Sequence, residues 1–284
     1  MSGLEGRRVL ITGAARGIGA ATAQRLHQRG ARLALAGIEP EQLERTASEC
    51  DALAIRCDVR NRGEVEHAVH AAVDHLGGLD VVVANAGVAA QLPLVGGDPE
   101  IFERTIAVNL LGVYYTLRAA GPHIAHKRGY ALAISSLAAA VHPPLLGAYC
   151  AAKAGVEALG DVLRVELRPS GARVGVAYFA ELDTDMTRRG FGTEAARKLQ
   201  AGTGPLGHVA PLEAGIDAIE RGIARRSRHV VAPRWVAGVL PIRTVVQQLL
   251  ELGLRTRRLD TVLEIARDEH AGLTTELPER APDS

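Results

Sequence analysis

Residues 8–29 read RVLITGAARGIGAATAQRLHQR, which is a short apolar run, a glycine-rich turn and an alanine-rich helical stretch. This order predicts a strand that passes through a tight turn into a helix. Glycines in such a turn let the backbone approach a pyrophosphate, and the N-terminus of the helix offers free N–H groups to the anion. The residues expected to hold the anion are Gly13, Arg16, Gly17, Ile18 and Gly19. A tight turn without a ligand is the alternative.

The same alternation of apolar strand and helix continues along most of the chain. Further strands are expected at Leu33–Ala36, Leu53–Cys57, Leu79–Ala84, Tyr130–Ser135, Arg173–Phe179 and His229–Ala232. This pattern predicts an α/β fold, a Rossmann-like, doubly wound, seven-stranded parallel sheet in a single domain over residues 1–232. Because only 3% of the residues are aromatic while 47% are hydrophobic, the core is expected to consist mainly of Ala, Val, Leu and Ile.

The ends of the second and third strands are where the adenosine of a dinucleotide is expected to lie. Gly37 occupies the position at which an Asp or Glu would accept a hydrogen bond from the free 2′-OH of NAD. Without that carboxylate, Arg16 is expected to pair with the 2′-phosphate of NADP, so NADP is favoured, although Glu39 keeps NAD open. Asp58 and Val59 are expected to flank the adenine, and a helix N-cap is the alternative for Asp58.

The fourth strand ends in a second glycine turn, Asn85-Ala86-Gly87. This turn falls at the carboxyl end of a central strand, where open α/β sheets bind ligands. A long helix is expected from Pro99 to about His126, with the polar Asn109 in its middle. A buried Asn usually has a hydrogen-bond partner, so Asn109 is expected to form either a structural bond or a link in a proton path.

The stretch Ile134–Lys153, ISSLAAAVHPPLLGAYCAAK, carries the clearest chemical signal. If a helix begins at Gly147, Tyr149 and Lys153 lie on the same face, one turn apart. An adjacent cation favours the phenolate of a tyrosine, whose pKa is ordinarily about 10, so Tyr149 is expected to act as a general acid and base. Ser136, at the end of a strand, is expected to form a hydrogen bond with the substrate oxygen that exchanges a proton with Tyr149. A surface helix that carries Tyr and Lys by chance is the alternative.

With these motifs the chain resembles the short-chain dehydrogenases/reductases over about residues 5–232. TGAARGIG (Thr12–Gly19) is similar to the family's TGxxxGxG cofactor turn, and ANAG (Ala84–Gly87) is similar to its NNAG turn. The family's Asn-Ser-Tyr-Lys tetrad falls on Asn109, Ser136, Tyr149 and Lys153. The resemblance implies an NAD(P)-dependent oxidoreductase acting on an alcohol/carbonyl pair, a strand order of 3-2-1-4-5-6-7, and a homodimer or homotetramer formed through the long helices.

The resemblance also implies a role for each site residue. Tyr149 gives a proton to a carbonyl, or takes one from an alcohol, while a hydride moves to or from the nicotinamide. Lys153 lowers the pKa of the phenol and holds the nicotinamide ribose, and Ser136 orients the substrate oxygen. Asn109 holds a water that relays protons through Lys153. Thr184 contacts the nicotinamide carboxamide or the phosphate.

Phe179 and Ala180 stand where the family usually has Pro-Gly. This departure motivates a different functional class, a dinucleotide-binding regulatory protein that has lost turnover. The substrate is expected to lie between Leu92–Val95, His142–Leu146 and the segment from Thr184 to about Gly207. Because the first two segments are mainly apolar, a hydrophobic ketone or secondary alcohol, such as a steroid-like, terpenoid or fatty compound, is expected. Loops that pack only on one another are the alternative.

Composition excludes several other classes of protein. The net charge of +1 gives no global field that would favour nucleic acid or a membrane. The three cysteines, Cys50, Cys57 and Cys150, lack metal-ligand spacing, which predicts a reducing compartment and no metal site. The N-terminus does not read as a signal peptide, and no apolar run is long enough to span a bilayer. A cytoplasmic location is therefore expected.

A helical C-terminal extension is expected over residues 233–273, beyond the part of the chain that resembles the family. Between residues 221 and 258 arginines outnumber acidic residues nine to one, and they are interleaved with the apolar segments Trp235–Ile242 and Val245–Leu254. The favoured interpretation is an amphipathic helix packed on its own subunit or across a dimer. Contact with a membrane surface, as in a lipid or steroid reductase, is the alternative. The polar residues 274–284 are expected to be disordered.

Overall fold

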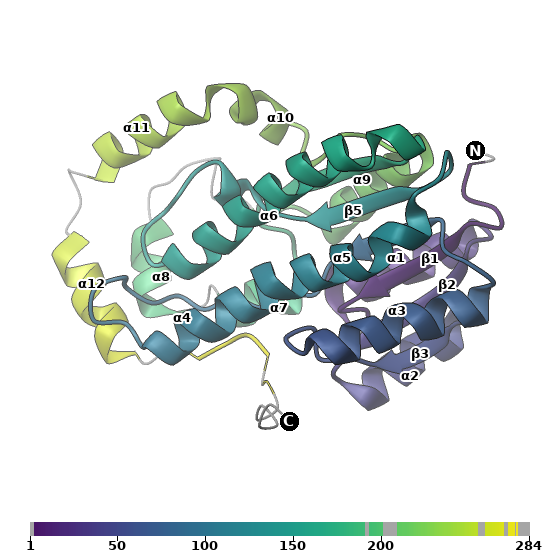
Figure 1. Cartoon of the computed structure of the whole chain (residues 1–284). Coiled ribbons are helices and arrows are strands. Elements are labelled where there is room, and N and C mark those ends of the chain that lie inside the picture. The colour runs from purple at the N-terminus through teal and green to yellow at the C-terminus, as the bar shows by residue number, and fades with distance from the viewer. Residues whose placement is uncertain are drawn as a thin grey trace.

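The structure is a computed structural model that describes residues 3–190, 193–200, 209–254, 259–269, 272–275 and 277. The strands of this described chain form one parallel seven-stranded sheet in the order β3-β2-β1-β4-β5-β6-β7 (Figure 1). The strands are β1 (Arg8–Thr12), β2 (Arg32–Gly37), β3 (Leu53–Arg56), β4 (Val81–Ala84), β5 (Tyr130–Ile134), β6 (Arg173–Phe179) and β7 (His229–Ala232). The predicted fold class and strand order are confirmed.

Helices cover both faces of the sheet (Figure 1). One layer consists of α1 (Gly17–Gln28), α2 (Pro40–Glu49) and α9 (Leu212–Arg225), and the other of α3 (Arg62–Leu76), α5 (Gly112–Ile124) and α6 (Gly147–Glu166). Successive residues of β1 point to opposite layers: Ile11 packs with the core that contains Leu26, and Leu10 packs with the core that contains Val69. Because both faces are covered, the strands are almost continuously apolar.

The long helix expected from Pro99 to about His126 is present, but its middle widens into a π-helical turn. It consists of α4 (Pro99–Ile106), a π-helical turn (Ala107–Leu111) and α5. Asp98 caps the start of α4, where its side chain accepts a hydrogen bond from the backbone N–H of Glu100. Such π turns occur frequently at functional sites, and this one contains Asn109.

The structure tests the N-cap alternative for Asp58, while its expected contact with the adenine stays a prediction. Asn61, not Asp58, caps α3, because the Asn61 side chain accepts hydrogen bonds from the N–H groups of Gly63 and Glu64. Asp58 instead forms a buried ion pair with Arg60, with 2.6 Å between Asp58 Oδ2 and the guanidinium. The N-cap alternative for Asp58 is therefore wrong.

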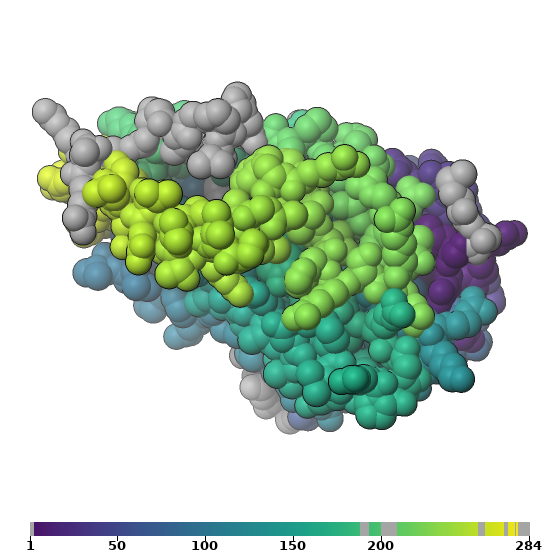
Figure 2. All heavy atoms as spheres, turned by 90° about the horizontal axis from the view of Figure 1, so that it is seen from above, coloured from purple at the N-terminus to yellow at the C-terminus, as the bar shows by residue number. Residues whose placement is uncertain are grey.

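The C-terminal extension lies beyond the carboxyl edge of the sheet. It consists of α10 (Val236–Val239), a 3₁₀ turn (Leu240–Ile242), α11 (Arg243–Leu254) and α12 (Leu259–Asp268), and α10 and α11 run across one face of the molecule (Figures 1 and 2). α12 packs against α8 (Glu194–Gln200) through Val262, Ala266 and Ala195. Within the described residues, no helix combines the length and the apolar character needed to cross a bilayer.

Two polar contacts attach α11 to the body of the protein. Arg243 donates hydrogen bonds of 2.9 Å to both carboxylate oxygens of Glu157, which lies on α6 one turn after Lys153. The side-chain oxygen of Gln247 accepts a 2.8 Å hydrogen bond from the backbone N–H of His142. The extension thus packs on its own subunit, as favoured, although it contains an outward row of apolar side chains as well.

Candidate active site

The carboxyl ends of the central strands open into one cavity of about 760 Å³. Most of the predicted site residues line it: Gly13, Arg16, Gly17, Ile18, Gly37, Asp58, Val59, Asn85, Ala86, Gly87, Ser136, Tyr149, Lys153 and Thr184. Two predicted residues, Gly19 and Asn109, lie behind the cavity wall rather than on it. Residues more than 170 positions apart therefore meet at one site.

The three glycines of the first turn serve different purposes. A Cβ on Gly13 would lie 2.6 Å from the Cα of Ala86, and a Cβ on Gly19 would lie 2.2 Å from the carbonyl oxygen of Gly13. Gly13 is therefore required by the close approach of the second glycine turn, and Gly19 by close packing within the first turn. Gly17 has a φ of +58° and no atom within 4 Å of a built Cβ, so its backbone faces open space. This open space fits the expectation that the backbone at Gly17 approaches a pyrophosphate, which stays a prediction.

Hydrogen bonds join the first glycine turn to the second. The Thr12 hydroxyl accepts from the backbone N–H groups of Asn85 and Ala86, at 3.1 and 3.3 Å. In return the Asn85 side chain donates to the carbonyl oxygens of Thr12 and Gly13, at 2.9 and 3.1 Å. The two turns thus form a single rigid edge of the cavity.

Asn109 holds the chain that follows the second turn. It is fully buried, its Oδ1 accepts from the N–H of Val88, and its Nδ2 donates to the carbonyl of Val88, both at 2.8 Å. The structural bond that the sequence predicted for Asn109 is therefore present. Its other expected role, in a proton path, stays a prediction.

Arg16 does not stand free at the adenosine end of the cavity. Its Nε lies 2.9 Å from Glu39 Oε1, and its guanidinium also donates to the Thr275 hydroxyl and, at 3.4 Å, to the Thr274 carbonyl. A Cβ on Gly37 would find ordinary contacts of 3.5 Å or more, so the position tolerates a side chain. The residue that the sequence assigned to a 2′-phosphate is thus already paired with a carboxylate.

The catalytic candidates converge where β5 meets α6. Lys153 is buried, and its Nζ donates a 2.9 Å hydrogen bond to the carbonyl of Ile134. The Ser135 hydroxyl donates to the backbone carbonyl of Lys153 at 2.8 Å, whereas the Ser136 hydroxyl donates to the carbonyl of Phe179 at 3.2 Å. Because Ser135 is tied to the α6 backbone, Ser136 is the serine whose hydroxyl lies beside Tyr149.

Burial controls the ionisation of these groups. It raises the pKa of Tyr149 to about 12, while a hydrogen bond with Ser136 acts in the opposite direction. Burial also lowers the pKa of Lys153 to about 8. The pKa of Tyr149 lies above its ordinary value because desolvation of the phenolate dominates, and the lowering by Lys153 that the resemblance implies stays a prediction. At neutral pH Tyr149 is a protonated donor.

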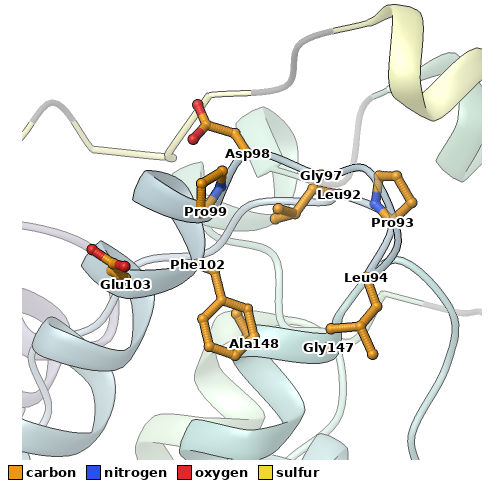
Figure 3. A pocket seen from close by; sticks show the side chains of 10 residues that line it. All are labelled: Leu92, Pro93, Leu94, Gly97, Asp98, Pro99, Phe102, Glu103, Gly147 and Ala148. Carbon is orange, nitrogen blue, oxygen red and sulfur yellow. The ribbon is translucent and has the colours of Figure 1, made fainter.

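The structure corrects one of the three predicted substrate segments. Leu92, Pro93 and Leu94 do not line the main cavity; they border a separate hollow of about 200 Å³, in which Phe102 points toward Ala148 (Figure 3). The apolar pattern of this loop gave no indication of which side chains face outward. Other residues of this hollow are Gly97, Asp98, Pro99, Glu103 and Gly147.

The other two substrate segments are placed as expected. Val141, Pro143, Pro144 and Leu146 line the main cavity, as do Thr184–Thr187, Ala196 and Leu199. His142 is exposed, in agreement with a surface histidine. Residues 191–192 and 201–207 of the third segment lie outside the described residues.

Several residues of the wall were missed by sequence reasoning. Gln91 lines the cavity and is only 6% exposed. The C-terminal extension contributes Trp235, Val239, Val246, Leu249, Leu250, Gly253 and Leu254. The apolar spacing of residues 245–254 was a usable signal for a packed helix, but not for which surface it would cover.

The C-terminal segment after α12 also reaches the cavity. Thr274 is buried and exchanges two hydrogen bonds with Ala89, donating from its N–H at 2.9 Å and accepting through its hydroxyl at 3.0 Å. Thr275 and Leu277 line the cavity. At these positions the expectation of a disordered tail is wrong, because the chain is fixed by the loop that it covers.

No cluster of three or more His, Cys, Asp or Glu side chains that would hold a metal ion occurs in the described part of the chain.

Comparisons with known proteins agree with this geometry. The sequence model described as "short chain dehydrogenase" matches residues 7–195. The 11-beta-hydroxysteroid dehydrogenase-like 6 of Arabidopsis thaliana is 32% identical over 264 residues, which cover 87% of this chain and 75% of the relative. Glycine betaine reductase ATRR of Emericella nidulans is 35% identical over 201 residues, which are 69% of this chain but only 16% of that protein.

A solved structure supports the fold. The short chain dehydrogenase/reductase from Burkholderia phymatum, solved in complex with NAD, superimposes with a TM-score of 0.75 at 23% identity, covering 89% of this chain and 97% of its own. The cavity suits a dinucleotide, since open space lies over Gly17 and residues at the carboxyl ends of six strands, β1 to β6, border it. The chain belongs to the short-chain dehydrogenase/reductase family and is an NAD(P)-dependent oxidoreductase that acts on CH–OH and C=O groups.

Proposed function

We propose that the chain interconverts a hydrophobic ketone and its secondary alcohol, with Tyr149 as the general acid and base. The observation that carries this proposal is the cavity wall around Tyr149. The side chains that residues 235–254 add to it are apolar: Trp235, Val239, Val246, Leu249, Leu250 and Leu254. A concave site with apolar walls and few polar groups is typical of sites for hydrophobic ligands.

In this mechanism a bound NAD(P) supplies or accepts the hydride. The Tyr149 hydroxyl, protonated because burial raises its pKa to about 12, gives its proton to the carbonyl oxygen during reduction and takes it back during oxidation. The Ser136 hydroxyl orients the same oxygen. Lys153, whose pKa is about 8, carries positive charge at neutral pH and stabilises the phenolate left after the transfer. Asn109 keeps the neighbouring loop in place through Val88.

The names of the relatives do not select the substrate, because one refers to a steroid and another to the polar glycine betaine. The proposal of a hydrophobic substrate therefore rests on the apolar cavity wall and not on the relatives. We infer for the coenzyme that the Arg16–Glu39 pair has no net charge to offer a 2′-phosphate, and that Glu39 is available to the free 2′-OH of NAD. This favours NAD, against the preference for NADP drawn from the sequence.

The test is a substrate panel run with NADH and NADPH, and in the reverse direction with NAD and NADP. The panel contains steroid, terpenoid and long-chain ketones, with sugars and betaine aldehyde as polar controls. We expect turnover of hydrophobic ketones. Coenzyme binding without turnover of any compound would instead favour the regulatory protein motivated by Phe179 and Ala180, and turnover of only polar compounds would contradict the hydrophobic substrate.

Oligomer formation and membrane contact are separate proposals. The outward faces of α5 and α6 expose Tyr114, Val162 and Val165, which supports a homodimer or homotetramer through these helices. Light scattering on the purified protein tests this, with a monomer as the contradicting result. The exposed Val245 and Leu252 of α11, which do not line the cavity, would be the residues to contact a membrane. Vesicle cosedimentation that is unchanged in a Val245→Gln/Leu252→Gln variant would remove that alternative.

A further inference from the structure

Gln91 has an amide group that the protein itself does not fully use. It is only 6% exposed and lines the main cavity. Its Oε1 accepts a 2.8 Å hydrogen bond from the hydroxyl of Thr193. Within the described residues no hydrogen bond is donated by its amide nitrogen, which carries two N–H donors. These donors are therefore left for a ligand in the cavity.

The orientation of the amide follows from the bonds of Thr193. The Thr193 hydroxyl already accepts a 3.0 Å hydrogen bond from the backbone N–H of Ala196, so its single hydrogen is free to go to Gln91 Oε1. Thr193 is itself held at the start of α8, where the Glu269 carboxylate of the C-terminal extension accepts a 3.1 Å bond from the N–H of Ala195. With the oxygen held by Thr193, the nitrogen of Gln91 is the atom that remains available.

The backbone around Gln91 is fixed on both sides. Val88 is held by Asn109 and Ala89 by Thr274, each through two hydrogen bonds. On the other side, the N–H of Leu92 donates to the carbonyl of Leu145 at 2.9 Å. A donor held in this way loses little conformational entropy when a ligand binds, which is the condition for a selective contact.

We propose that Gln91 is a specificity-determining residue that donates a hydrogen bond to a substrate oxygen remote from the reacting carbon. The substrate class is then a hydrophobic ketone or secondary alcohol that carries a second oxygen acceptor, such as a carbonyl, hydroxyl or ester group. This inference rests on the proposed function. A substrate without the second oxygen would leave desolvated N–H groups unpaired in an apolar cavity, and sites of that kind reject such analogues.

The experiment compares steroid and bicyclic ketones in pairs that differ only in a second oxygen far from the reducible carbonyl. Wild-type protein should show a kcat/KM about tenfold or more higher for the oxygenated member, as a hydrogen bond of ordinary strength in a dry site predicts. Gln91→Leu should abolish this preference, mainly through KM for the ketone, while KM for the coenzyme stays unchanged. Gln91→Glu, which keeps the shape but replaces the donors by acceptors, should reverse the preference.

Gln28→Leu is the matched control, because Gln28 is exposed at the end of α1, and it should behave as wild type. Thr193→Val should weaken the preference without abolishing it. The proposal is overturned if the wild type treats the members of every pair alike, or if both Gln91 variants keep the wild-type preference. The absence of turnover for all ketones with both coenzymes is a different result, which would contradict the proposed function itself.

Discussion

Lys153 Nζ lies 5.4 Å from the centroid of the Tyr149 ring, one turn further along α6. The ammonium is held in place by the carbonyl of Ile134 rather than by the phenol oxygen. Tyr149 is thus a half-buried, protonated donor with a cation beside its ring. The attraction between the Lys153 charge and the tyrosine oxygen is strongest after the proton has left. The arrangement fits a group that stabilises the phenolate product of proton transfer.

Replacing Tyr149 by Phe removes the proton donor and leaves the shape of the cavity. We expect turnover to fall by about 10²- to 10⁴-fold, the usual contribution of general acid–base catalysis, with little change in coenzyme affinity. Steady-state kinetics and coenzyme fluorescence titration measure the two effects. Tyr114→Phe is the control, since Tyr114 is 43% exposed on α5. Wild-type turnover in the Tyr149 variant would contradict the assignment.

Replacing Glu39 by Gln should change the choice of coenzyme. The substitution removes the carboxylate that binds Arg16, so the guanidinium becomes available to a 2′-phosphate. Because a hydrogen bond to a charged group contributes about 1.5–3 kcal/mol, we expect the ratio of kcat/KM for NADPH to that for NADH to rise by about tenfold or more. The exposed Glu41 provides the control variant Glu41→Gln. An unchanged ratio would show that Arg16 and Glu39 do not distinguish the 2′-OH of NADH from the 2′-phosphate of NADPH.

Adding one methyl group should affect two glycines of the first turn differently. Gly19→Ala places a Cβ about 2.2 Å from the Gly13 carbonyl, so the turn must open, and both stability and coenzyme binding should be lost. The Cβ of Gly17→Ala meets no atom within 4 Å. This variant should lose about 1–2 kcal/mol of folding free energy, because an alanine disfavours the positive φ. Thermal unfolding should therefore separate the two variants, with Gly19→Ala melting at the lower temperature. Equal melting temperatures would contradict the packing argument.

Thr274→Val tests whether the C-terminal segment stabilises the loop after β4. The change keeps the shape of the side chain but leaves the fully buried N–H of Ala89 without the hydroxyl that accepts its hydrogen bond. An unsatisfied buried donor costs about 1–3 kcal/mol, so urea unfolding should show a loss of that size. Thr244→Val, on the exposed start of α11, should be neutral. A neutral Thr274 variant would mean that the segment is not docked in solution.

The three thiols should be unreactive in the folded protein. Burial raises the pKa of Cys50 to about 11 and those of Cys57 and Cys150 to about 12, from an ordinary 9.0. A thiol reagent at pH 8 should therefore label none of them quickly until denaturant is added. Rapid labelling of any one thiol under native conditions would contradict its burial.

The same shifts imply a pH dependence of stability. The folded chain holds the thiol protons more tightly than the unfolded chain, so the stability that these groups contribute is present below pH 9. It is lost as the pH rises from 9.0 through 11 to 12. Urea midpoints measured between pH 8 and pH 10 should fall as the pH rises, and substitution of all three cysteines by Ala should reduce that slope.

Much of the fold and of the catalytic centre follows from local pattern. The apolar runs, the glycine turn at Gly13–Gly19 and the four-residue spacing of Tyr149 and Lys153 are short-range features, because strand burial, positive φ and helical periodicity each depend on a few neighbouring residues. These features predicted the sheet, and most of the site residues that they indicated line the cavity. They also identified Ser136 correctly as the serine beside Tyr149.

Tertiary structure decided the contacts between distant segments. Only the folded chain pairs Arg16 with Glu39, brings Thr274 onto Ala89, and turns Leu92–Leu94 away from the cavity while Gln91 faces it. It also decided the pKa of Tyr149, because desolvation depends on everything packed around the ring and not on the one cation that the sequence places nearby. The sequence by itself thus determined the chemistry of proton and hydride transfer. Which side chains of the C-terminal extension line the cavity depended on packing over the sheet edge, since no local pattern encodes contacts between residues nearly two hundred positions apart.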